Sequence, residues 1–210
     1  MPNYTTKQCP ICGKEFTAPA KTKTCGRVCG RRISKPRAPV FLPETDTYLR
    51  PLTQGKFTEI DACDVDLAKF KWNLSHGYAR RNASREDGYR GVLIHREILG
   101  RVIGRELLLS EEVDHKDNNP LLNTRANLRI ATHSQNMANV KVSKTNSSGY
   151  KGVRWLYQLK KWLARIDSDG ITHYIGVYAT PELAHAAYCE AAKKYHGEFA
   201  NDGNGAINHD

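Results

Sequence analysis

Asp114 and His115 stand side by side, with Asn127 twelve residues after the histidine and Asn136 nine residues further on. An unperturbed histidine has a pKa of about 6.5, so its ring can accept a proton from water near neutral pH. Carboxylate and carboxamide oxygens are ligands that suit Mg²⁺ or Mn²⁺. Hydrolysis of a phosphodiester needs a nucleophile and a cation that offsets the charge on the phosphate. These residue types therefore indicate metal-assisted cleavage of a nucleic acid backbone.

Neutral amides are suited to this region because further carboxylates would repel an incoming phosphate, whereas an amide binds or orients without adding negative charge. Three more asparagines fit the turns of a loop, since Asn tolerates left-handed backbone conformations: Asn118, Asn119 and Asn123. The alternative is a turn-rich loop in which the Asp and His only cap neighbouring backbone groups. The joint spacing favours the catalytic interpretation.

This spacing resembles the DH-N-N variant of the His-Asn-His (HNH) nuclease motif. The segments LTQGKFTEID, GYARR and LIHREILG also resemble phage and intron-encoded HNH homing endonucleases, so the likeness covers residues 48–140. The resemblance implies a ββα-metal (His-Me finger) fold in which His115 is the general base and Asn127 orients its ring. It further implies that Asp114 and Asn136 hold a catalytic Mg²⁺ or Mn²⁺. The basic residues of these segments are expected to contact DNA: Arg80, Arg81 and Arg96.

Two other histidines lie near the motif. His95, in LIHR, either approaches the active site or the DNA backbone, or is a core histidine, and both interpretations stay open. His133 precedes Asn136 by three residues and could substitute as a ligand.

Short strand-like runs and two helices position these residues. Strands are predicted at 47–53, 56–61, 77–82, 107–115 and 128–132, and helices at 96–104 and 133–141. Thr132 and Gln135 have the form of a capping box at the start of the second helix. Because consecutive strand residues point to opposite faces, the strand that carries Asp114 and His115 must end or bulge there.

Four cysteines fall in two close pairs in the basic N-terminal segment: Cys9, Cys12, Cys25 and Cys29. In a cytosolic chain such pairs favour a structural Zn²⁺, which would stabilise a segment too small to bury a core. Reactive or simply reduced thiols are the alternative. The remaining cysteines, Cys63 and Cys189, are expected to be buried free thiols. We place the zinc module at 1–35 and a proline-containing linker at 36–47.

A polar linker at 141–148 leads to a C-terminal domain at 149–203, predicted to form three strands and a helix that Thr180 and Pro181 open and Gly197 closes. GVRW, KWLARI, YIGVY and HGEFA resemble the plant apetala-two/ethylene-response-factor DNA-binding domain. Four residues match the DNA-contacting positions or stand beside them: Arg154, Lys161, Trp162 and Arg165. Trp155 and Trp162 could instead be core aromatics.

The net charge of +10 is concentrated in residues 1–40, which hold nine Lys or Arg against one acid. A polyanion is the natural partner, because neutralised phosphates release counterions. We therefore expect an α+β multidomain, monomeric endonuclease acting on double-stranded DNA. Without an apolar run for a signal peptide or membrane span, it is expected in the cytoplasm, that of a host cell if phage-encoded. The rival hypotheses are a DNA-binding regulator without catalysis, and a zinc-stabilised scaffold for RNA or protein.

Overall fold

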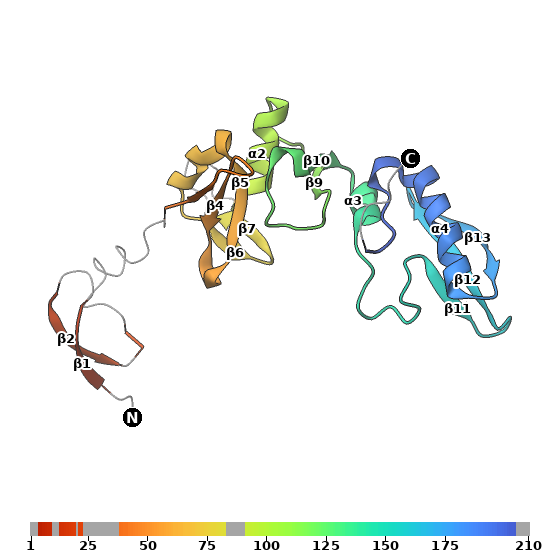
Figure 1. Cartoon of the computed structure of the whole chain (residues 1–210), viewed down its shortest axis with the longest axis horizontal. Coiled ribbons are helices and arrows are strands. Elements are labelled where there is room, and N and C mark those ends of the chain that lie inside the picture. The colour runs from red at the N-terminus through yellow and green to blue at the C-terminus, as the bar shows by residue number, and fades with distance from the viewer. Residues whose placement is uncertain (1–3, 10–12, 20, 23–37, 83–90, 205–210) are drawn as a thin grey trace.

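The computed structural model describes residues 4–9, 13–19, 21–22, 38–82 and 91–204 (Figure 1). It is a mixed α+β structure built from several small antiparallel sheets. The first is a hairpin of β1 (Tyr4–Gln8) and β2 (Glu15–Pro19), and Cys9 at its turn is buried. The other three cysteines of the predicted zinc module lie outside the described residues.

The central region holds two three-stranded sheets, with strand orders β3-β4-β5 and β6-β7-β8. Their strands are β3 (Val40–Leu42), β4 (Thr47–Pro51), β5 (Phe57–Asp61), β6 (Asn73–Ser75), β7 (Tyr78–Arg81) and β8 (Val92–Leu93). The 3₁₀ helices η1 (Thr53–Gly55) and η2 (Ala62–Lys69) connect them. Helix α2 (Ile94–Ile103) turns Ile94, Ile98 and Leu99 into the shared core. Burial of these side chains provides the main stabilisation of this region.

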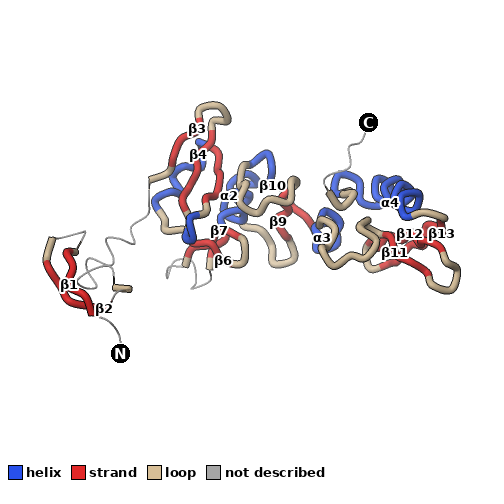
Figure 2. The backbone as a smooth tube through the Cα atoms, turned by 60° about the horizontal axis from the view of Figure 1, so that its bottom comes forward, coloured by secondary structure: helices blue, strands red, loops and turns tan. Residues whose placement is uncertain are grey.

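A strand-strand-helix unit follows, in which β9 (Glu112–His115) pairs with β10 (Leu128–Ala131) and α3 (His133–Asn139) packs beside the pair (Figure 2). The loop between the strands ends in η3 (Arg125–Asn127). The predicted capping box is confirmed, because Thr132 accepts from the backbone of Gln135 and the Gln135 side chain accepts from Thr132 N–H. This cap fixes the start of α3.

The C-terminal region is a three-stranded antiparallel sheet packed against one long helix (Figure 1). Its elements are β11 (Val153–Leu156), β12 (Lys161–Ser168), β13 (Ile171–Tyr178), α4 (Pro181–His196) and η4 (Gly197–Phe199). Thr180 caps α4, Pro181 opens it and Gly197 ends it, as predicted. Ala184 and Ala192 are fully buried, which lets the helix lie close to the sheet.

Three sequence predictions differ from the structure. The strand predicted at 107–115 is limited to β9, because the Arg96 guanidinium draws the Leu107, Leu108 and Glu111 carbonyls into a turn. Part of the expected linker at 36–47 pairs with β4 as β3. Cys63 is exposed and Cys189 is half-buried, so the prediction of two buried thiols was wrong. Within the described ranges no helix is long and apolar enough to cross a membrane.

Candidate functional site

Strand β9 ends at His115, the second of the two consecutive residues that are predicted to serve one site. The chain then turns, with Asn118 N–H donating to the His115 carbonyl and Asn118 in the left-handed region at φ 60°. Asp114 and His115 are only 3% and 6% exposed. Their polar atoms are therefore withdrawn from water and need partners within the protein.

The His115 ring is held by Asn123, whose Oδ1 lies 3.0 Å from His115 Nε2. Asn123 is fully buried, and its Nδ2 donates to Thr58 Oγ1 at 2.7 Å and to the Pro120 carbonyl at 3.3 Å. A carbonyl can only accept, so this contact fixes the orientation of the carboxamide. The Asn123 oxygen must then accept from the ring, which places the proton of neutral His115 on Nε2. Nδ1 is left as the basic nitrogen.

Two aromatic rings pack around His115. His95 meets it edge to face, with ring centroids 5.2 Å apart, and Tyr78 lies against both rings. Burial lowers the pKa of His115, although the hydrogen bond to Asn123 opposes the shift. Burial, with the charges of His115 and Arg96, lowers the pKa of His95 to about 3, so this ring is neutral at working pH. The structure thus brings His95 to His115, buried among aromatic rings.

The His95 Nδ1 is buried, and it has no hydrogen-bond partner among the described residues. A buried nitrogen of this kind is costly when the ring is charged. The surroundings of His95 therefore favour its neutral state over its charged state.

The Asp114 carboxylate has one donor on each oxygen. Arg129 Nε donates to Oδ2 at 2.7 Å, and Asn139 Nδ2 donates to Oδ1 at 2.9 Å. Each carboxylate oxygen has a second lone-pair direction, so both can still accept a further contact. Arg129 and Asn139 could not be selected from the sequence, because neither belongs to the spaced motif.

Asn136 lies on α3 opposite Glu112, and its Nδ2 donates to Glu112 Oε2 at 2.5 Å. No hydrogen bond within the described segments reaches Asn136 Oδ1, so this oxygen is available as a ligand. His133 also engages Glu112, through Nδ1 at 2.9 Å from Oε1, and is largely exposed. The structure does not bring Asp114 and Asn136 into hydrogen-bond contact with one another.

The donor chemistry on the facing surfaces of β9 and α3 fits a hard divalent cation, because it consists of carboxylate and carboxamide oxygens. Asp114 and Glu112 lie two apart on β9, and each contacts α3 through an asparagine. No cluster of three or more His, Cys, Asp or Glu side chains suited to a metal occurs in the part of the chain that the structure describes. An ion here would therefore rely on Asn136 and on water or substrate oxygens.

Asn127 organises the loop, and none of its side-chain hydrogen bonds to the described residues reaches the His115 ring. Its Oδ1 accepts from Asp117 N–H, and its Nδ2 donates to Asp117 Oδ1 and to the Leu122 carbonyl. Its backbone carbonyl accepts from Lys116 N–H. The ring contact expected of Asn127 is made by Asn123, which the sequence placed among the turn residues.

Strand β5 anchors the loop from the other side. Glu59 exchanges backbone hydrogen bonds with Leu121 and Asn123, and Asp61 accepts from Arg125 N–H at 2.6 Å. The fully buried Asp64 accepts from Arg101 and from two nitrogens of Arg125. These contacts fix the loop to a sheet about sixty residues earlier in the chain.

The predicted DNA-contacting arginines of the central region have different surroundings. Arg81 is buried over the Phe70 ring and pairs with Glu97, and Arg96 donates to three backbone carbonyls. Of these three arginines, Arg80 is the one whose side chain is exposed to solvent.

In the C-terminal sheet, strand register separates two faces. Arg154 pairs with Leu163, and because alternate residues share a face, Lys161 points to that same side. Arg165 follows a shift in the pairing register between Ala164 and Arg165. Trp162 points to the other side and packs against the cluster of Val153, Ala164 and Ala184 at the helix. Arg154 and Lys161 are exposed, whereas Arg165 is half-buried.

Comparison with known proteins decides the family. Over 164 residues the chain is 34% identical to a protein named "Uncharacterized HNH endonuclease L560" from Acanthamoeba polyphaga mimivirus, covering 76% of this chain and 82% of that protein. The chain belongs to the HNH endonuclease family. It is also 33% identical over 88 residues to "Protein 3.8" of Escherichia phage T7, covering 42% of this chain and 72% of that protein. No family profile and no solved structure matches this HNH endonuclease.

Proposed function

We propose that this HNH endonuclease is a site-specific, homing-type DNA nuclease that uses one divalent metal ion and a histidine base, and that it nicks one strand. The observation that carries the proposal is the fixed tautomer of His115. Asn123 and Thr58 hold the proton on Nε2, so Nδ1 is a proton acceptor beside Asp114 at the end of β9. This arrangement is what activation of a water molecule requires.

The metal ion would be held by Asp114 and by the available oxygen of Asn136. Mg²⁺ or Mn²⁺ bound there would supply a positive charge that stabilises the phosphate and the leaving oxygen. His115 accepts the proton from the attacking water at Nδ1. Asn123 keeps the ring oriented during this transfer, and Asn127 keeps the loop folded around it.

Recognition of double-stranded DNA would fall to the flanking regions. The exposed Arg154 and Lys161 on one face of the C-terminal sheet support phosphate contact there. The basic N-terminal segment, with Zn²⁺ on Cys9 and its three partners in sequence, would add a second contact. Linked weak contacts raise the effective concentration at an asymmetric target, so a monomer suffices. A monomer with one catalytic histidine of this kind cuts one strand per encounter.

The proposal is tested by incubating the protein with supercoiled plasmid that carries the target, in Mg²⁺ or Mn²⁺. We expect wild-type protein to convert it to the open-circular form and His115→Ala to lose at least about 100-fold in rate, the usual contribution of a general base. His76→Asn is the matched control, because His76 is an exposed turn residue at φ 49° and Asn tolerates that conformation.

Cleavage unaffected by His115→Ala would exclude this residue as the base. Specific binding to a target without any cleavage would favour the regulator hypothesis.

A further inference from the structure

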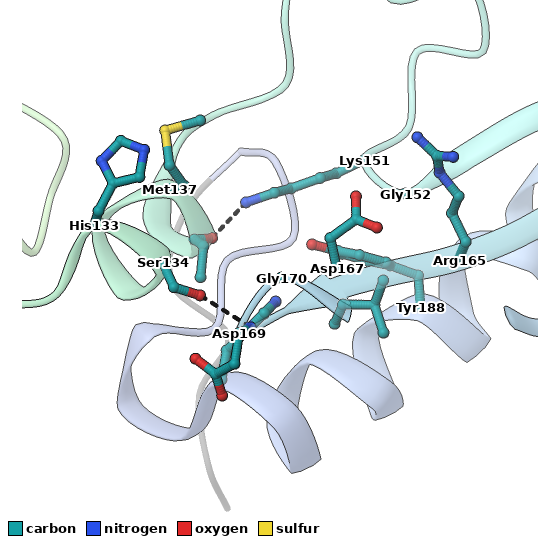
Figure 3. Close-up of a pocket in the computed structure, with 13 residues that line it drawn as sticks. His133, Ser134, Met137, Lys151, Gly152, Arg165, Asp167, Asp169, Gly170 and Tyr188 are labelled. Carbon is teal, nitrogen blue, oxygen red and sulfur yellow. Dashed lines mark hydrogen bonds between the residues drawn. The ribbon is translucent and has the colours of Figure 1, made fainter. Parts of the chain in front are cut away.

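The C-terminal region meets the strand-strand-helix unit along α3. Lys151 Nζ donates to the carbonyls of Ala138 and Val140 at the end of α3, at 2.5 and 2.7 Å, and the Asp169 N–H donates to Ser134 Oγ. These contacts border a cavity of about 500 Å³ between α3 and β12 (Figure 3). Burial lowers the pKa of Lys151 to about 8, so the amine still carries its charge at neutral pH and can serve both carbonyls.

A second set of contacts runs from η4 to β10. The Arg129 Nη1 donates to the Glu198 carbonyl at 2.6 Å, and its guanidinium lies 3.8 Å from the centre of the Phe199 ring. Phe199 is buried with Ala131 and Ala138, so η4 packs directly on the unit. The same Arg129 donates through Nε to Asp114 Oδ2.

A third set passes through buried asparagines. Asn201 is fully buried, and its Nδ2 donates to Asn139 Oδ1 at 3.0 Å. Asn118 donates to the same oxygen. With its oxygen occupied by two donors, Asn139 must present Nδ2 to Asp114 Oδ1 and to the His115 carbonyl. If this carboxamide flipped, its oxygen would face the two acceptors, and its NH₂ group would face the donors Asn118 and Asn201.

We propose that residues 198–201 are part of the catalytic centre, where they position Asp114 through Arg129 and Asn139. Both oxygens of Asp114 are held by side chains that the C-terminal segment holds in turn. The C-terminal region therefore does two tasks: its sheet contacts DNA, and its last residues orient the proposed metal ligand. This inference rests on the proposed function, because it assigns Asp114 to the metal site.

The deciding variants are Arg129→Lys and Asn201→Ala in the full chain. Lysine has a single ammonium and cannot reproduce the separate contacts of Nε and Nη1. Alanine at 201 removes one of the two donors that orient Asn139. Glu190→Gln is the matched control, because Glu190 is 77% exposed on α4 and pairs with Lys193, outside the segment 198–201.

The primary measurement is Mn²⁺ affinity without DNA, from titration of the free-ion paramagnetic resonance signal. We expect both variants to bind Mn²⁺ about 10- to 100-fold more weakly, as loss of outer contacts to metal ligands does, and Glu190→Gln to stay within about twofold. Single-turnover kcat should fall with the affinity, while metal-free DNA binding stays unchanged. Arg154→Ala should show the reverse, with weaker DNA binding and unchanged Mn²⁺ affinity.

Wild-type Mn²⁺ affinity in folded Asn201→Ala and Arg129→Lys would overturn the positioning role and leave the proposed function intact. Tighter binding would overturn it too, because Arg129 would then compete with the ion. If Arg129→Lys does not fold, as thermal melting reports, Asn201→Ala decides alone. Wild-type protein that neither binds Mn²⁺ nor cleaves DNA would instead refute the proposed function, and this inference with it.

Discussion

Replacing Asn123 by alanine is the most direct test of how the histidine base is prepared. The change removes the side-chain acceptor of His115 Nε2–H and leaves that donor buried, since the residue is 6% exposed. A buried donor without a partner costs about 1–3 kcal/mol. Part of the same energy holds the ring in one tautomer and one orientation, so its loss lets unproductive states compete with the productive one.

The expected effect on catalysis follows from that energy. About 1.4 kcal/mol corresponds to tenfold in a population, so kcat should fall by about 10-fold, with an upper end near 100-fold. DNA affinity and Mn²⁺ affinity should stay within about twofold, because Asn123 contacts neither Asp114 nor the C-terminal sheet. Thr58→Val should give a smaller loss, since Asn123 retains its bond to the Pro120 carbonyl.

The assay is single-turnover nicking of a labelled duplex that carries the target, at saturating protein and metal. Asn119→Ala is the matched control, because Asn119 is an exposed asparagine of the same loop whose Oδ1 accepts only the Leu121 N–H. A folded Asn123→Ala protein with wild-type kcat would refute the assignment of the tautomer and of Nδ1 as the base. An equal loss in both variants would attribute the effect to the loop as a whole.

Four further outcomes are expected. The pKa of His95 is lower in the folded protein than its unfolded value of about 6.5, so the unfolded chain binds more protons as the pH falls. The free energy of unfolding should therefore decrease by about 1.5 kcal/mol between pH 6.5 and pH 5. Urea denaturation should show a smaller decrease for His95→Phe. Asp64→Ala should destabilise the protein by about 3 kcal/mol in the same assay, because two arginines lose a fully buried partner. Arg154→Ala and Lys161→Ala should each reduce the salt dependence of DNA binding by about one ion, measured by fluorescence anisotropy across a salt series. Cys25→Ser should lower the zinc content below one ion per chain by elemental analysis, and unchanged zinc would exclude it as a ligand.

Much of the catalytic unit could be predicted from local sequence. Thr132 and Gln135 cap α3 through contacts three residues apart, which a sequence pattern records directly. The end of β9 at His115 followed from the requirement that Asp114 and His115 serve one site. The start and end of α4 were likewise set by Thr180 and Gly197.

The partners of the side chains in the candidate site could not be predicted in this way. Asn123 and Asn127 are chemically identical and lie in one loop, and which one meets the His115 ring depends on Thr58, 65 residues from Asn123. The role of Asn139 depends on Asn201, 62 residues away. Spacing carries no information on contacts that form only when separate sheets pack together. The same limit applies to Arg81 and Arg96, which the sequence predicted as DNA contacts. In the folded protein Arg81 pairs with Glu97 and Arg96 donates to the Glu111 carbonyl.

The two consecutive residues at the end of β9 are supported from opposite sides, and this explains how one short strand can present both. His115 is held through Asn123 by β5 of the central sheet. Asp114 is held through Arg129 and Asn139 by the segment that follows α4. The two side chains share none of these partners, so each is fixed by a different region of the chain. The central sheet thus orients the His115 ring and the C-terminal segment orients the Asp114 carboxylate, so the geometry of the candidate site depends on both regions being folded against the strand-strand-helix unit at the same time.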